Sequence, residues 1–81
     1  MKLFVGGLSW GTKGETLEKA FSAFGKVLSA NIVLDKETRR SRGFGFVEME
    51  NKEEAMEAMN KLNNTELDGR TIFVSEAKAR E

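Results

Sequence analysis

The stretch Arg42 to Met49, RGFGFVEM, decides the fold of this 81-residue chain, because it is apolar on both faces of the strand that it predicts. A strand so rich in phenylalanine and valine is normally buried on two sides. A chain of this length forms one small domain, here residues 1–81, and buries only about 60% of its unfolded surface. It cannot cover both faces of a sheet, so one apolar row is expected to stay exposed as a binding surface.

The composition excludes several kinds of functional site. The chain has no cysteine and no histidine, which removes disulfides, thiolate nucleophiles, the usual zinc sites and histidine-based catalysis. We therefore expect no metal, no cofactor and no enzymatic activity. The residues from Met1 to Gly6 contain no apolar run typical of a signal peptide or a membrane span. We expect a soluble monomer with no membrane partner and no small-molecule substrate, in the cytoplasm, or in the nucleus of a eukaryotic source.

The charge is segregated along the chain, although 13 basic and 13 acidic residues give a net charge of zero. The sequence pI of about 6.3 is lower than that of a typical nucleic-acid-binding domain. Acidic residues nevertheless crowd between Glu48 and Glu57, and four cations gather in a short segment: Lys36, Arg39, Arg40 and Arg42. Such local patches attract a charged ligand more effectively than the total charge suggests.

Alternation of apolar and polar residues predicts four strands. The Asp68-Gly69 pair is a turn signal ahead of the last of them. The predicted strands are Lys2 to Gly6, Val27 to Leu34, Arg42 to Met49 and Arg70 to Ala77.

Two amphipathic helices are predicted between the strands, each with apolar residues at i, i+3, i+4 and i+7. Thr12 with Glu15, and Asn51 with Glu54, have the spacing of capping boxes, which predicts where the two helices begin. Gly25 stands where a C-terminal cap of the first helix is expected. The apolar stripes are Leu17, Ala20, Phe21 and Phe24 in the first helix, and Ala55, Ala58, Met59 and Leu62 in the second.

The predicted order, β-α-β-β-α-β, is that of an α+β, ferredoxin-like sandwich. Right-handed crossovers place both helices on one face of a four-stranded antiparallel sheet and leave the other face bare. The uniformly apolar rows belong under the helices, because a lysine or a glutamate would be costly there. The mixed rows are then expected to face solvent, and they carry Phe4, Phe44, Phe46 and Phe73.

Two further interpretations concern single residues. Gly43 and Gly45 share the alternation of the buried Val47, which predicts that they let a helix approach the strand closely. Trp10, in the loop before the first helix, is interpreted as a partly buried anchor rather than as a stacking ring.

Aromatic rings on a solvated sheet beside cations suit unpaired bases, because each ring offers a stacking face worth about 1–3 kcal/mol per base while cations hold the phosphates. The residues therefore predict single-stranded nucleic acid as the ligand. Cations are predicted on two sides of the sheet: Lys36, Arg39, Arg40 and Arg42 at one side, and Lys78 and Arg80 just beyond the last strand. Lys2, on the row of Phe4, is a further candidate binding residue. The candidate readers of base edges are Asn31, Glu48, Ser75 and Glu76.

Two motifs resemble those of the RNA-recognition motif family. RGFGFVEM, Arg42 to Met49, is similar to the family's eight-residue motif, and LFVGGL, Leu3 to Leu8, is similar to its six-residue motif on the first strand. The chain resembles in particular short single-motif proteins, bacterial and glycine-rich or cold-inducible. The resemblance implies single-stranded RNA as the partner, with single-stranded DNA as an alternative. It also implies stacking by Phe4 and Phe44, a ribose or base contact by Phe46, and a phosphate contact by Arg42.

The chain departs from the family pattern at three positions. Met49 replaces a usual aromatic residue, Arg39 stands where the turn commonly has glycine, and Phe73 is an additional ring. RNA chaperone activity or post-transcriptional regulation would be cellular uses of such a domain. A protein-interaction domain of the same fold is the alternative function, and a small phosphatase is a third, for which no paired base and nucleophile are visible.

Overall fold

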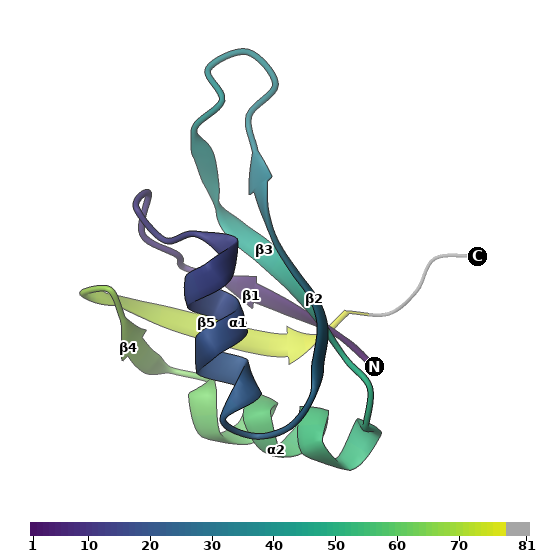
Figure 1. Cartoon of the computed structure of the whole chain (residues 1–81). Helices are drawn as coiled ribbons and strands as arrows, with labels where there is room; N and C mark the ends of the chain where they lie inside the picture. The colour runs from purple at the N-terminus through teal and green to yellow at the C-terminus, as the bar shows by residue number, and fades with distance from the viewer. Residues whose placement is uncertain (78–81) are drawn as a thin grey trace.

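The computed structural model describes residues 1–77 and forms one antiparallel sheet with both helices packed on the same face (Figure 1). The strand order is β2-β3-β1-β5-β4. This arrangement confirms the α+β, ferredoxin-like fold. The elements are β1 (Lys2–Gly6), α1 (Gly14–Ser22), β2 (Val27–Leu34), β3 (Ser41–Met49), α2 (Lys52–Leu62), β4 (Thr65–Leu67) and β5 (Arg70–Glu76).

The sheet has five strands rather than the predicted four. The additional strand, β4, pairs antiparallel with β5, with Thr65 opposite Ile72. The predicted turn joins them: Asp68 and Gly69 have φ angles of 53° and 81°, and positive values at both positions are what a tight hairpin turn requires. The strand itself escaped prediction because three residues, Thr-Glu-Leu, are too few to establish an alternating pattern.

On β1, β3 and β5 the uniformly apolar rows, which were expected under the helices, are buried. These rows are Leu3 with Val5, Val47 with Met49, and Ile72 with Val74. The half-buried exceptions are Ala30 and Ile32 on β2, which is an edge strand with irregular pairing between Val27 and Ser29 and between Ile32 and Leu34. Leu34, at the far end of this strand, is 51% exposed. The buried core comprises Leu3, Val5, Leu8, Leu17, Phe21, Val47, Met49, Ala55, Ala58, Ile72 and Val74.

The start of α2 follows its predicted cap, whereas the start of α1 does not. The Asn51 side chain accepts a hydrogen bond from the Glu54 N–H at 3.0 Å. Helix α1 instead begins after Lys13, which makes no side-chain cap. The hydroxyl of Thr12 is buried and donates to Asp68 Oδ2 at 2.8 Å, so it ties the β1–α1 loop to the β4–β5 turn.

The predicted helix cap at Gly25 is also wrong. Helix α1 ends at Ser22, with Ala23 as its C-cap, and Gly25 does not adopt a positive φ. The Glu54 side chain of α2 occupies the space into which a Cβ at residue 25 would project. Glycine at this position therefore allows a close approach between the loop and α2.

The two glycines of β3 do not serve the predicted helix approach. A Cβ on Gly45 would collide with the backbone oxygen of Asn31 and crowd Ile32, both on the neighbouring strand β2. Gly43 has a φ of 84°, and its carbonyl accepts a hydrogen bond from the Leu8 N–H at 2.8 Å. Strand pairing and backbone conformation, rather than helix packing, therefore require these glycines.

Candidate nucleic-acid interface

Three phenylalanine rings pack together on the face of the sheet that the helices leave open. Phe4 of β1 lies directly opposite Phe46 of β3, and Phe44 lies one row further along. The ring centroids are 5.6 Å apart for Phe4–Phe44, 5.7 Å for Phe4–Phe46 and 6.4 Å for Phe44–Phe46. We call these three residues the phenylalanine cluster. Because each ring is held by the other two, the surface is ordered before a ligand arrives.

Two cations flank the phenylalanine cluster. The Lys2 Nζ lies 4.9 Å from the centroid of the Phe46 ring, and the Arg42 Cζ lies 5.8 Å from that of Phe44. At these separations each cation is attracted to the ring below it. Both side chains are exposed, so their charges remain accessible to an anionic ligand.

Polar side chains lie beside the rings in the strand register. Asn31 of β2 is opposite Phe46, and Glu48 of β3 is opposite Lys2. Within residues 1–77 the one ion pair joins Lys26 to Glu50 at 3.6 Å, so it does not engage Lys2 or Glu48. Asn31 and Glu48, the predicted readers of base edges, are both exposed next to the cluster.

Phe73 extends the aromatic surface to a third strand. Its side chain is 54% exposed, and its register partner on β1 is Gly6, which pairs on its other side with Phe44. Because Gly6 has no side chain, nothing projects from the sheet between Phe73 and Phe44 at this position. The edge of the Phe4 ring lies over Gly6 instead. The open face therefore carries four phenylalanines, three in mutual contact and one set apart.

The register does not bring Glu76 to this face. Glu76 is opposite Leu3, in the row that faces the helices, because it shares the alternation of the buried Val74. Ser75 and Glu76 were both predicted as readers of base edges, but consecutive residues of a strand point to opposite faces. Lys78 and Arg80 lie outside the described residues.

The interpretation of Trp10 as a partly buried anchor is wrong, because its side chain is 75% exposed. The residue lies in the β1–α1 loop between Ser9 and Gly11, outside any periodic apolar pattern that would have packed it against the core. That isolation was the available signal that the ring faces solvent.

A hydrogen-bonded turn holds the cationic loop between β2 and β3. Asp35 Oδ1 accepts from the backbone N–H groups of Glu37 at 2.8 Å and Thr38 at 3.1 Å. The bonds from Thr38 and Glu37, with a smaller contribution from the charge of Arg42, lower the pKa of the exposed Asp35 carboxyl below its ordinary value. Arg39 follows with a φ of 63°, the left-handed conformation in which glycine is common.

The described residues contain no group of three or more acidic, cysteine or histidine side chains placed to hold a metal ion. None of the helices formed by residues 1–77 has the length and apolar character needed to cross a membrane.

Sequence comparison places the chain among known relatives. A family model described as RNA recognition motif matches residues 3–72. Glycine-rich RNA-binding protein 2 of Sorghum bicolor is 48% identical over 79 residues, which are 98% of this chain and 47% of that protein. Small RNA binding protein 1 of Cucumis sativus is 51% identical over 98% of this chain and 49% of its own length. The chain thus spans about half the length of these curated relatives.

Solved structures agree with the sequence comparison. The crystal structure of RNA binding protein PG1 superposes with a TM-score of 0.95 at 42% identity and covers 100% of this chain and 98% of its own. The second RRM domain of yeast poly(U)-binding protein Pub1 gives 0.87 at 36% identity, over 99% and 96%. On the family match, the identities and the shared structure, this chain belongs to the RNA recognition motif family.

Proposed function

We propose that the chain binds single-stranded RNA by stacking bases on the phenylalanine cluster. The observation that carries the proposal is the group of three mutually packed rings on an open sheet face, with Lys2 and Arg42 beside it. The names of the relatives, which are RNA-binding proteins, support the same ligand. The family is non-catalytic, in keeping with the expectation that the chain is not an enzyme.

The arrangement suits two adjacent nucleotides. Phe4 and Phe44 offer faces for one base each, Phe46 contacts a ribose or a base between them, and Arg42 neutralises the phosphate. Each stack contributes about 1–3 kcal/mol, so one such domain binds RNA with modest affinity. Asn31 and Glu48 supply an amide and a carboxylate within reach of base edges, where selectivity among bases would arise.

The proposal is tested with the double substitution Phe44→Ala and Phe46→Ala. Because these rings are only half-buried and the core lies on the other face of the sheet, the variant is expected to remain folded by circular dichroism. Its affinity for short single-stranded RNA should fall by about 1–3 kcal/mol for each stack lost, measured by fluorescence anisotropy.

The matched control is Met56→Ala, which removes a 42%-exposed apolar side chain from α2 and should leave the affinity unchanged. A folded double variant that binds RNA as tightly as the parent would overturn the proposal. It would favour a protein-interaction domain that uses its helices instead. Equal binding to DNA of the same sequence would widen the ligand to single strands in general.

A further inference from the structure

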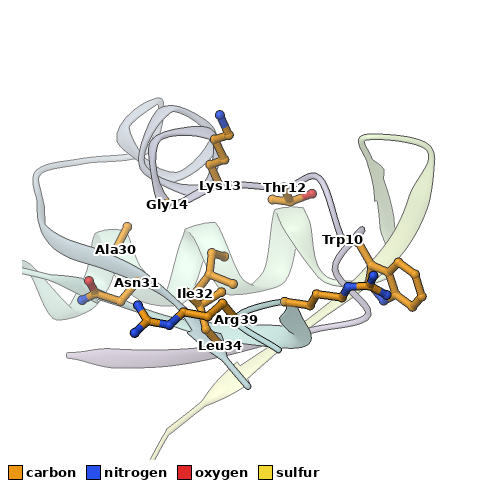
Figure 2. Close-up of a pocket in the computed structure, with 10 residues that line it drawn as sticks. Trp10, Thr12, Lys13, Gly14, Ala30, Asn31, Ile32, Leu34 and Arg39 are labelled. Carbon is orange, nitrogen blue, oxygen red and sulfur yellow. The ribbon is translucent and has the colours of Figure 1, made fainter. Parts of the chain in front are cut away.

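A groove of about 630 Å³ lies on the helix side of the sheet, between the N-terminus of α1 and the β2–β3 hairpin (Figure 2). Its walls come from three segments: the β1–α1 loop with the start of α1, strand β2, and the turn that follows it. Figure 1 shows that the hairpin extends past the N-terminal end of α1, which leaves the last part of β2 uncovered by a helix. The phenylalanine cluster lies on the other face.

The lining combines exposed apolar surface with positive charge. Trp10 and Leu34, two large apolar side chains that are 75% and 51% exposed, both line it. Lys13, Arg39 and Arg40 also line it, and among residues 1–77 no acidic side chain does. A flat ring beside three cations fits an anionic ligand with a planar apolar part, which is the chemistry of a nucleotide.

The shape of the groove is set by backbone contacts. A Cβ on Gly14 would lie 2.8 Å from the carbonyl oxygen of Ala30, so glycine lets the start of α1 approach β2 closely. At the other end of the groove, the backbone carbonyl of Asp35 accepts a hydrogen bond from the Arg39 N–H at 2.9 Å. The Asp35 N–H donates to the Arg40 carbonyl at 2.8 Å. Both arginines therefore project from a hydrogen-bonded turn.

The groove is continuous with the open sheet face around the edge of the sheet. Strand β2 is the edge strand, so no further strand blocks the way from one face to the other. Asn31 pairs with Phe46 in the register of the open face and also lines the groove. An RNA strand that leaves the phenylalanine cluster over Asn31 can bend around β2 and meet Trp10.

We propose that this groove is a second nucleotide subsite, in which a base of the same RNA strand stacks on Trp10 while its phosphates contact Arg39 and Arg40. The inference rests on the proposed RNA binding and extends it from one face of the sheet to the other. An acidic peptide would match the charge, but it would use neither the continuity through Asn31 nor the flat face of the indole. RNA is therefore the occupant that the structure favours.

The test uses the fluorescence of Trp10, because the chain contains one tryptophan and no tyrosine. RNA of about four nucleotides should occupy the sheet face alone, whereas RNA of about ten should also reach the groove. The longer RNA is expected to quench the tryptophan emission, and the shorter RNA to bind without quenching it.

Substitutions separate the ring from the charges. Trp10→Ala should weaken the binding of the longer RNA by about 5- to 100-fold and leave the shorter unaffected, while Trp10→Phe should retain most of the affinity. Arg40→Gln should also weaken only the longer RNA. Its matched control is Arg70→Gln at the far β4–β5 turn, which should change neither.

The outcomes distinguish the two proposals. If both RNAs bind and depend on Phe44 and Phe46, but neither quenches Trp10 and Trp10→Ala has no effect, the subsite is wrong and the sheet-face function stands. If neither RNA binds, both proposals fail. Quenching by a glutamate-rich peptide, with none by the longer RNA, would overturn the subsite and identify a peptide groove.

Discussion

Arg39 combines a positive charge beside the groove with a backbone conformation that is unfavourable for arginine. Its φ of 63° places the backbone of Arg39 in the left-handed region, which costs about 1–2 kcal/mol for a residue with a Cβ. The family pattern commonly has glycine there, which adopts this conformation without that cost. The chain thus carries a strained residue whose retained feature is a positive charge beside the proposed groove.

Arg39→Gly is expected to stabilise the fold by about 0.5–1 kcal/mol, because the relief of strain exceeds the entropy that glycine adds to the unfolded chain. Urea denaturation should show a higher midpoint with an unchanged slope. Arg40→Gly is the control, since Arg40 has no positive φ and gains no relief. A midpoint that falls equally in both variants would show that the left-handed conformation carries no strain.

Asp35 gives the same turn a dependence on pH. Its folded-state pKa is lowered by the N–H groups of Thr38 and Glu37, so the ionised carboxylate is favoured by folding. Its contribution is complete above the unfolded pKa of about 3.9 and is lost as the pH falls through the lower folded value.

A carboxyl titration by NMR should therefore give Asp35 a pKa below that of an unstructured aspartate. The amide signals of Glu37 and Thr38 should move with the same midpoint, because they donate to this carboxylate. Asp35→Ala should abolish the acidic transition at both amides. An ordinary pKa for Asp35 would mean that the turn does not hold the carboxylate in solution.

At the scale of elements, the pairing of β2 with β3 determines both proposed sites. The strand β3 carries Phe44 and Phe46 on the open face, while β2 carries Ile32 and Leu34 toward the groove. Gly45 lies between Phe44 and Phe46 in β3, and the backbone of Asn31 occupies the space that a side chain at residue 45 would need. The two strands can approach this closely only because residue 45 has no Cβ.

Gly45→Ala is accordingly expected to destabilise the fold by about 1–3 kcal/mol, because an added methyl group must push β2 away. Thermal unfolding by circular dichroism gives the change. Gly11→Ala is the matched control, since a Cβ there meets no atom within 4 Å. Equal stability of the two variants would show that β2 yields without cost, and that the glycine has some other role.

At the scale of the whole molecule, a neutral chain is organised into surfaces of opposite sign. Arg39 and Arg40 lie by the groove, Lys2 and Arg42 by the phenylalanine cluster, and the exposed Glu53 and Glu57 lie on α2. This separation directs a polyanion to the sheet and the hairpin and away from the second helix. The net charge of zero therefore does not predict the ligand.

Salt dependence of RNA affinity measures how many of these cations act. Each phosphate contact on a single strand contributes about −0.7 to the slope of log affinity against log salt. Two contacts, from Lys2 and Arg42, predict a slope of about −1.4 for a short RNA, and two more from Arg39 and Arg40 predict about −2.8 for a longer one. Identical slopes for the two lengths would contradict the participation of the hairpin arginines.

The same titration separates stacking from charge. Phe44→Ala with Phe46→Ala should lower the affinity at every salt concentration and leave the slope unchanged, because no cation is removed. A slope that changes in this variant would mean that the rings position the cations rather than the bases.

The amino-acid sequence by itself determined the fold class and the identity of the phenylalanine cluster. It also determined which side chains of β1, β3 and β5 face the helices. It could do so because alternation and helical periodicity are local, and a charged residue such as Lys2 or Glu48 labels the face that must meet water. The Asn51 cap and the turn at Asp68-Gly69 were predictable for the same reason, since each depends on a few neighbouring residues.

Only the tertiary structure decided the features that depend on residues distant in the chain. Thr12 bonds to Asp68 instead of capping its own helix, Gly45 is required by the backbone of β2, and Glu76 is turned to the helix side by its pairing with Leu3. The exposure of Trp10 and the groove beside it arise where the β2–β3 hairpin runs past the N-terminal end of α1. No local pattern records how far one element extends beyond another, because that distance is set by packing across the whole sheet.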